Sequence, residues 1–154
     1  MSLFMNFTKR MFLPTLMLNK NKMFFHNNTK LLSSIMYTND HETIHINEDI
    51  IKIGLSGYAI QEMGEIVFIE PEFEEGDYVS KGDTLCTIES VKSTEDITAI
   101  CDGTIINYNN ELLSDYSQIK ELTENKSWFV KLKLNENIQT TNFMNYEEYH
   151  KHIK

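Results

Sequence analysis

Closely spaced strand patterns constrain the fold of this chain more than any other feature of its sequence. Seven short segments between residues 43 and 134 are rich in β-branched residues, and several alternate with polar ones, which favours half-buried strands. These segments are residues 43–46, 50–55, 65–70, 84–89, 94–100, 104–108 and 129–134. Many short strands at close spacing predict a mainly β fold, a small sandwich or flattened barrel with a few short helices.

Three turns between these segments each place a glycine beside an aspartate, at Gly76-Asp77, Gly82-Asp83 and Asp102-Gly103. Glycine reaches positive φ without steric cost, and aspartate favours tight turns through its side chain. The three positions therefore predict chain reversals that keep the flanking strands short.

Two short helices are expected between the strands. Ser56 is a good N-cap for a helix through Met63, and Gly64 is a suitable residue to end it. Ser114 is expected to cap a second helix that runs to about Leu122.

A third helix is expected at the C-terminus. Asn145 followed three residues later by Glu148 resembles a capping box. The apolar face of this helix is predicted to consist of Tyr146, Tyr149 and Ile153, packed on the sheets.

Residues 1–38 differ in composition from the rest of the chain. They contain no Asp or Glu and five basic residues: Lys9, Arg10, Lys20, Lys22 and Lys30. A basic, acid-free segment of this kind is typical of an organelle presequence. We therefore expect residues 1–38 to be a targeting presequence and residues 39–154 to be one folded domain. The mitochondrial matrix is the expected location, with another organelle as the alternative. A secretory signal, which Pro14 and Thr15 would interrupt, and a disordered Asn-rich tail are the alternatives.

The expected domain is strongly acidic. Residues 40–154 hold all 23 acidic residues of the chain and nine basic ones, a net charge of −14. Such a domain repels nucleic acid and suits basic protein partners. No apolar run approaches the roughly 20 residues that a membrane helix needs, so no membrane contact is expected.

The sequence offers little for a catalytic or metal site. Cys86 and Cys101 do not have metal-ligand spacing and are expected to be small strand residues, with a redox dithiol pair as the alternative. His150 and His152 are two residues apart, which does not align them on one helical face. There is no P-loop, nucleophile elbow or H-E-x-x-H motif. We expect no metal ion, no catalytic residue and hence no enzyme.

One lysine has a setting that suits chemical modification. Ser90-Val91-Lys92-Ser93 is a tight connection between two expected strands. A lysine at a hairpin tip projects into solvent, where it stays charged and is a poor nucleophile. Lys92 is therefore better placed to be modified by another protein than to act itself, although an ordinary solvated lysine is the alternative.

The stretch around Lys92 resembles the lipoyl/biotinyl carrier superfamily. The superfamily pattern is two Gly-Asp turns, an Ile-Glu strand end, a modified Lys on a hairpin and a closing Gly. All occur here in order: Gly76-Asp77, Gly82-Asp83, Ile88-Glu89, Lys92 and Gly103. Glu89-Ser90-Val91-Lys92 is similar to the version found in H-proteins of the glycine cleavage system. Biotin carriers instead have Met on both sides of the Lys, and lipoyl domains of oxo-acid dehydrogenases have Asp before it.

This resemblance covers about residues 40–154. His41-Glu42 is similar to the family's His-Glu-Trp opening, with Thr43 in place of the Trp. Residues 54–59, 63–70, 128–133 and 145–149 are similar to its first helix, the following strand, its last strand and its terminal helix. The family's Pro near residues 100–101, its Pro-rich turn at residues 72–75 and its Gly at position 127 are absent, which affects loops and not the attachment site.

The resemblance implies a lipoyl-domain-like barrel-sandwich hybrid that carries lipoate on Lys92. It implies a non-enzymatic carrier of the glycine cleavage system. Such a carrier takes the aminomethyl group of glycine from a pyridoxal-phosphate glycine decarboxylase (P-protein) to a tetrahydrofolate aminomethyltransferase (T-protein), and electrons to dihydrolipoyl dehydrogenase (L-protein). Lipoyl-attaching enzymes are further implied partners. A lipoate relay to other complexes and an unmodified binding module of the same fold are the alternatives.

The resemblance also implies a cleft that protects the loaded arm from water. Glu42 and Asp96 are implied to line this cleft and to pair with the cationic amine. The alternative for both is an ordinary solvated strand carboxylate.

Overall fold

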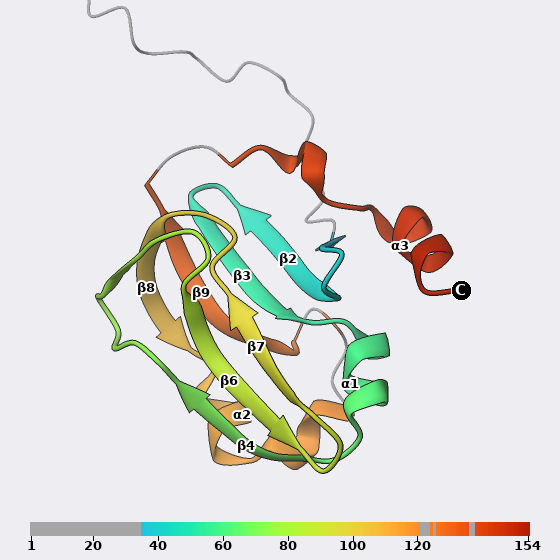
Figure 1. Cartoon of the computed structure of the whole chain (residues 1–154). Coiled ribbons are helices and arrows are strands. Elements are labelled where there is room, and N and C mark those ends of the chain that lie inside the picture. The colour runs from blue at the N-terminus through green and yellow to red at the C-terminus, as the bar shows by residue number, and fades with distance from the viewer. Residues whose placement is uncertain (1–34, 121–123, 125, 136–137) are drawn as a thin grey trace, which may run out of the picture. The chain divides into compact units, whose positions relative to one another are not determined.

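The computed structural model describes residues 35–120, 124, 126–135 and 138–154. The segment before residue 35, which contains most of the expected presequence, lies outside these described residues. Within them, two antiparallel sheets make up most of the domain (Figure 1).

The larger sheet has six strands in the order β1-β2-β3-β9-β8-β5. They are β1 (Met36–Tyr37), β2 (Glu42–Asn47), β3 (Ile50–Leu55), β9 (Trp128–Leu134), β8 (Gly103–Tyr108) and β5 (Tyr78–Val79). The smaller sheet has the order β4-β6-β7, with β4 (Ile66–Pro71), β6 (Thr84–Ser90) and β7 (Thr94–Thr98). All seven expected strands are present, and the mainly β fold of short strands and short helices is confirmed.

Strand alternation decides which residues enter the core between the sheets. Ile44 of β2 lies opposite Ile53 of β3, and both are fully buried. Their neighbours His45 and Lys52 are also opposite each other but point to the outer face of the sheet, because successive side chains of a strand alternate. The smaller sheet contributes Ile88, Ile97 and Leu85 to the same core.

The two-residue strands β1 and β5 were not expected from the sequence. β1 pairs with β2 through Met36–Ile44 and Tyr37–Thr43. Ordered structure therefore includes the last residues of the segment 1–38, ahead of the expected domain start at residue 39. Removal of a presequence stays a prediction.

Helix α1 (Gly57–Met63) is as expected. The Ser56 side chain accepts a hydrogen bond from the Ala59 amide, and Gly64 ends the helix at a φ of 83°. The prediction that Ser114 caps the start of a helix running to about Leu122 was wrong. Ser114 is the last residue of α2 (Asn110–Ser114), and a separate 3₁₀ helix, η1, covers Tyr116–Lys120.

The C-terminal helix α3 (Tyr146–His152) follows the short 3₁₀ helix η2 (Thr140–Asn142) and begins with the expected capping box of Asn145 and Glu148. Its apolar face differs from the prediction, because Tyr149 is buried while Tyr146 is 60% exposed. α3 lies at one edge of the larger sheet, near β1. Tyr149 is the buried residue of this helix, so the expected apolar face of three residues is not formed.

The three Gly-Asp turns use glycine for two different reasons. Gly76 and Gly82 have φ of 97° and 95°, as a turn with positive φ requires. Gly103 has no positive φ; instead, a Cβ there would lie 2.8 Å from the Lys133 carbonyl oxygen on β9. The glycine at 103 is needed for the close approach of two strands. Among the described residues, no helix is long and apolar enough to cross a membrane.

Candidate functional site

Lys92 lies at the tip of the hairpin between β6 and β7, as expected. The strands are held in register by pairs such as Glu89–Thr94 and Thr87–Asp96. The tip itself has three residues between the strands, and Lys92 is exposed.

Ser90 fixes the shape of this tip. Its amide donates to the Ser93 carbonyl at 2.8 Å and its hydroxyl to the same oxygen at 2.9 Å. The Ser90 Oγ in turn accepts from the amides of Ser93 at 2.9 Å and Lys92 at 3.2 Å. The Val91 amide donates to the Glu65 carbonyl at 2.9 Å, which attaches the tip to the segment just before β4. The backbone of Lys92 is therefore rigid while its side chain is accessible.

The Lys92 side chain lies over the end of helix α1. Its Nζ donates to the Glu62 carbonyl oxygen at 3.1 Å, one of the free carbonyls at a helix C-terminus. A Cβ on Gly64 would lie 3.3 Å from the Lys92 Cε. Gly64 therefore ends the helix and also leaves room for the lysine.

Exposed apolar side chains lie close to Lys92. Val91 is 63% exposed, and Val67 and Phe68 of β4 are each 44% exposed. A register shift between Ile66 and Phe68 sets Val67 out of the regular ladder, which explains why two consecutive strand residues face solvent.

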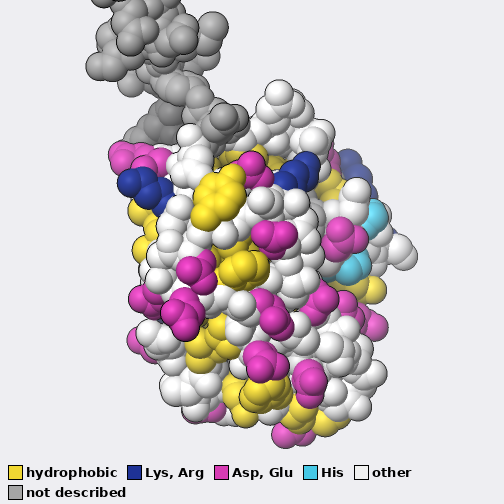
Figure 2. Space-filling view, turned by 60° about the vertical axis from the view of Figure 1, so that its left-hand side comes forward, with side chains coloured by type: hydrophobic (Ala, Val, Ile, Leu, Met, Phe, Trp, Pro, Cys, Tyr) yellow, Lys and Arg dark blue, Asp and Glu magenta, His cyan; other side chains and the backbone are white. Residues whose placement is uncertain are grey.

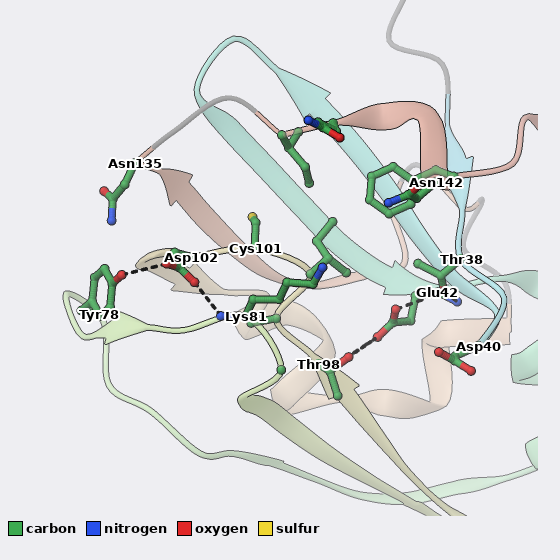
Figure 3. A pocket seen from close by; sticks show the side chains of 16 residues that line it. Thr38, Asp40, Glu42, Tyr78, Lys81, Thr98, Cys101, Asp102, Asn135 and Asn142 are labelled. Atoms are coloured by element: carbon green, nitrogen blue, oxygen red, sulfur yellow. Dashed lines mark hydrogen bonds between the residues drawn. The ribbon is translucent and has the colours of Figure 1, made fainter.

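Figure 3 shows a cavity of about 600 Å³. Thr98, the last residue of β7, lines this cavity, which therefore lies at the other end of the β6–β7 hairpin from Lys92. It is lined by residues from several elements, among them Thr38, Asp40, Glu42, Lys81, Thr98, Cys101, Asp102 and Phe143. Asp102 closes one side by accepting hydrogen bonds from the Lys81 amide at 2.8 Å and the Tyr78 hydroxyl at 3.3 Å.

Glu42 is the buried carboxylate of this cavity, with 4% of its surface exposed. Its Oε1 accepts from the Thr98 amide at 3.1 Å and the Thr98 hydroxyl at 3.3 Å. Its Oε2 accepts from the Thr38 hydroxyl at 3.1 Å. Burial raises the pKa of Glu42 above 4.5, and the nearby Asp40 adds to this, while the three hydrogen bonds oppose it. A buried carboxylate that lines a cavity and has a raised pKa is a candidate functional residue.

Asp96 lies on the exposed side of β7 and accepts a hydrogen bond from the Thr87 hydroxyl at 2.8 Å. It is not among the residues that line the cavity. Asp96 and Thr98 are two residues apart on one strand, so their side chains point to the same face. Asp96 therefore lies between Lys92 and the cavity, while Glu42 lies in the cavity itself.

The sequence did not identify the residues that hold these groups. Thr38 and Thr98 orient Glu42, and the Glu62 carbonyl receives Lys92. Of the residues around Lys92 and Glu42, only Gly64 could be identified from the sequence, as the residue that ends a helix.

Cys86 is buried and Cys101 is half-buried; both are free thiols. Among the described residues, no group of three or more His, Cys, Asp or Glu side chains is arranged to hold a metal ion.

His41, next to Glu42, connects the start of β2 to the C-terminal helix. Its Nδ1 lies 2.9 Å from the Tyr149 hydroxyl, which lies 2.7 Å from the Ser56 Oγ. His41 has a φ of 67°, an unusual conformation for a non-glycine residue. These contacts join the N-cap of α1 to α3 and fix the backbone that presents Glu42.

Known proteins resemble this chain in sequence and in fold. The model of the family described as "Glycine cleavage H-protein" matches residues 35–154. The chain is 35% identical over 119 residues to a glycine cleavage system H protein of Xanthobacter autotrophicus, covering 77% of this chain and 94% of that protein. It is 40% identical over 100 residues to one of Picosynechococcus, covering 65% and 75%. A solved glycine cleavage system H protein from Mycobacterium marinum has the same fold, with a TM-score of 0.67 at 24% identity, covering 77% and 95% of the two chains.

Proposed function

Since the chain belongs to the glycine cleavage H-protein family, we propose that it is the lipoylated carrier of a glycine cleavage system, with Lys92 as the attachment site. The observation that carries the proposal is the setting of Lys92. Its exposed amine projects from a hairpin tip whose backbone is fixed by the hydrogen bonds of Ser90. An attaching enzyme can reach such an amine without unfolding the carrier.

The residues around Lys92 fit an amide-linked arm. Gly64 leaves the Lys92 methylene groups unobstructed, and the Nζ lies at the surface. Acylation removes the positive charge, so the contact with the Glu62 carbonyl weakens and the arm is released from the end of α1. When bound, lipoate supplies a strained cyclic disulfide that accepts an aminomethyl group together with its electrons.

The proposed partners are those that such a carrier must visit in turn. They are a pyridoxal-phosphate glycine decarboxylase, a tetrahydrofolate aminomethyltransferase, dihydrolipoyl dehydrogenase and the enzymes that attach lipoate. The carrier itself performs no catalysis in this scheme.

Acidic side chains are spread over the face in Figure 2. Glu70, Glu72, Glu74, Glu75 and Asp77 are all exposed. This surface suits brief contacts with basic partners.

Glu42 and Asp96 are proposed to receive the loaded arm. From Lys92 to Thr98 the chain advances six residues, about 20 Å in an extended strand. An arm lying along β7 passes Asp96 first and then approaches Glu42 and Asp40 at the cavity. Both carboxylates favour a cationic amine, and the walls of the cavity would shield one side of it from water.

The attachment site is tested by the mass of the intact protein from its native source, together with Lys92→Arg. The variant keeps the charge but cannot form the amide. We expect a lipoyl mass increment on the natural protein and none on the variant, while Lys120→Arg retains it. An increment that survives Lys92→Arg would show a different site. An unmodified natural protein would favour a binding module of the same fold.

The cleft is tested by the lifetime of the aminomethyl-loaded carrier. Glu42→Gln and Asp96→Asn are expected to shorten it, because each removes a carboxylate along the path of the arm. Glu95→Gln is the matched control, since Glu95 is exposed on the same strand but points to the other face. Equal lifetimes in all three variants would contradict a role for Glu42 and Asp96.

The mitochondrial matrix is the proposed location, with residues 1–38 as the source of a targeting presequence. Support comes from the five basic residues and the absence of acidic residues in this segment. Fractionation of the source cells, with the full-length and processed forms separated by mass, tests the location.

A further inference from the structure

The outer face of the larger sheet carries a basic cluster that the proposed carrier function does not use. His45 of β2, Lys52 of β3 and Lys131 of β9 lie opposite one another in register across three strands. Trp128 lies on the same face, opposite Gly54. We call these four residues the basic strip.

Trp128 forms the floor of the basic strip. The Lys131 Nζ lies 4.1 Å and the Lys52 Nζ 5.7 Å from the centroid of its ring. Two ammonium groups beside one half-buried aromatic ring provide both a positive field and an apolar surface. Tryptophan is enriched among the residues that contribute most to binding at protein interfaces.

The ammonium groups of Lys52 and Lys131 form no ion pair with an acidic side chain in the described part of the chain, whereas His45 interacts with Glu124. The ion pair found there joins Lys133 to Asp49 at 4.0 Å and includes neither Lys52 nor Lys131. Like charges directly opposite each other on neighbouring strands destabilise a sheet. The two ammonium groups repel each other across the strands, and a bound anion would reduce this repulsion.

A buried histidine lies at the edge of the strip. His45 is 9% exposed, and burial together with the charge of Lys52 lowers the pKa of its ring, while Glu124 opposes this shift. It points to the same face as Lys52, its register partner. The lowered pKa favours a neutral imidazole, so His45 adds a polar group, and not a charge, beside the two ammonium groups.

The basic strip is positively charged, whereas the domain as a whole is strongly negative. Residues 40–154 carry a net charge of −14, so an acidic partner is repelled over most of the surface. Lys52 and Lys131 offer such a partner an attractive position. Nucleic acid, with its continuous charge, would meet the surrounding carboxylates, whereas a short acidic segment need cover only the strip.

The strip and Lys92 lie on different sheets. Lys92 is on the β6–β7 hairpin of the smaller sheet, whereas the strip is on the face of the larger sheet that points away from the shared core. Figure 1 shows β6 and β7 as a separate layer from β2, β3 and β9. A partner at the strip therefore leaves the hairpin accessible.

We propose that the basic strip is a docking site for an acidic, carboxylate-rich segment of a partner protein. The contact holds the carrier to its system while the hairpin remains free to visit other active sites. It does not depend on Lys92 or its modification.

Trp128 provides a direct test, because it is the single tryptophan of the chain. The full-length protein is titrated with a short glutamate-only peptide while tryptophan fluorescence is recorded at constant ionic strength. We expect a saturable change that weakens with added salt. The double variant Lys52→Gln/Lys131→Gln should bind on the order of tenfold more weakly.

The control is Lys120→Gln/Lys151→Gln, which makes the same change in net charge at two exposed lysines away from the strip. It should bind the peptide as the natural protein does, and so should Lys92→Arg. The proposal is overturned if no saturable change occurs, or if both double variants lose affinity equally. A response to anionic lipid vesicles or nucleic acid, with none to the peptide, overturns it as well.

Discussion

The ring of Tyr37 lies parallel to the ring of Tyr149, with centroids 4.2 Å apart and an interplanar angle of 5°. The two residues are 112 positions apart in the sequence and join β1 to α3. The backbone of Tyr37 exchanges two hydrogen bonds of 2.9 Å with Met144, and its hydroxyl donates to Glu124 at 2.6 Å. The two ends of the domain therefore stabilise each other.

Tyr37→Ala is expected to destabilise the domain by about 3–5 kcal/mol, the usual cost of truncating a buried aromatic side chain. The substitution removes the stack on Tyr149 and leaves Glu124 without this donor. Chemical denaturation measures the change in free energy of unfolding. The control is Tyr146→Ala on the same helix as Tyr149, at a residue that is 60% exposed, where a change within about 0.5 kcal/mol is expected. Equal losses in both variants would contradict the role of the stack.

The position of Tyr37 also limits where a presequence can be removed. Cleavage after residue 37 would delete β1 and the stack on Tyr149. We therefore expect the N-terminus of the native protein to lie between about residue 27 and Ile35, a span judged from composition and from β1. N-terminal sequencing gives the answer. A mature form that begins at residue 39 would show that β1 is dispensable, and an intact Met1 on a cytosolic protein would exclude import.

Glu42 predicts a pH dependence of stability. Its pKa is raised above 4.5, chiefly by burial, so the folded state holds the proton more tightly than the unfolded state. Stability is therefore expected to fall as pH rises through the window just above 4.5. Glu42→Gln removes this titration and keeps groups that can bond to Thr98 and Thr38. Denaturation at several pH values should give a flatter curve for the variant, and parallel curves would argue against a raised pKa.

Docking through the acidic surface predicts sensitivity to salt. Attraction between exposed charges is screened over about 8 to 10 Å at physiological ionic strength. The apparent KM of methylene transfer from the loaded carrier should rise with salt while the turnover number changes little. Glu74→Lys/Glu75→Lys should mimic high salt, and Glu111→Lys on α2 is the control. A KM that stays constant across ionic strength would assign docking to the apolar residues around Lys92 instead.

Local features of the fold could be predicted because neighbouring residues determine them. Ser56 and Gly64 bound α1, and Asn145 with Glu148 begins α3, since each cap bonds within its own turn. The turns at Gly76 and Gly82 follow from positive φ at single residues. The position of Lys92 at a hairpin tip was equally local, because two strand patterns flank a short connection.

Other features depend on residues distant in the sequence. β1 and β5 are too short to show a pattern and exist because neighbouring strands pair with them. Tyr149 is buried instead of Tyr146 because Tyr37 lies beneath it. Gly103 is required by the backbone of β9, not by its own turn.

The sequence by itself determined the strands, the caps and an accessible Lys92, since these rest on contacts within a few residues. Tertiary structure alone decided the environment of Glu42, whose carboxylate is buried and held by Thr38 and Thr98. It also decided that Lys52 and Lys131 meet beside Trp128 on one face. Burial and charge at these positions arise when strands far apart in the chain pair and pack, which no local pattern encodes.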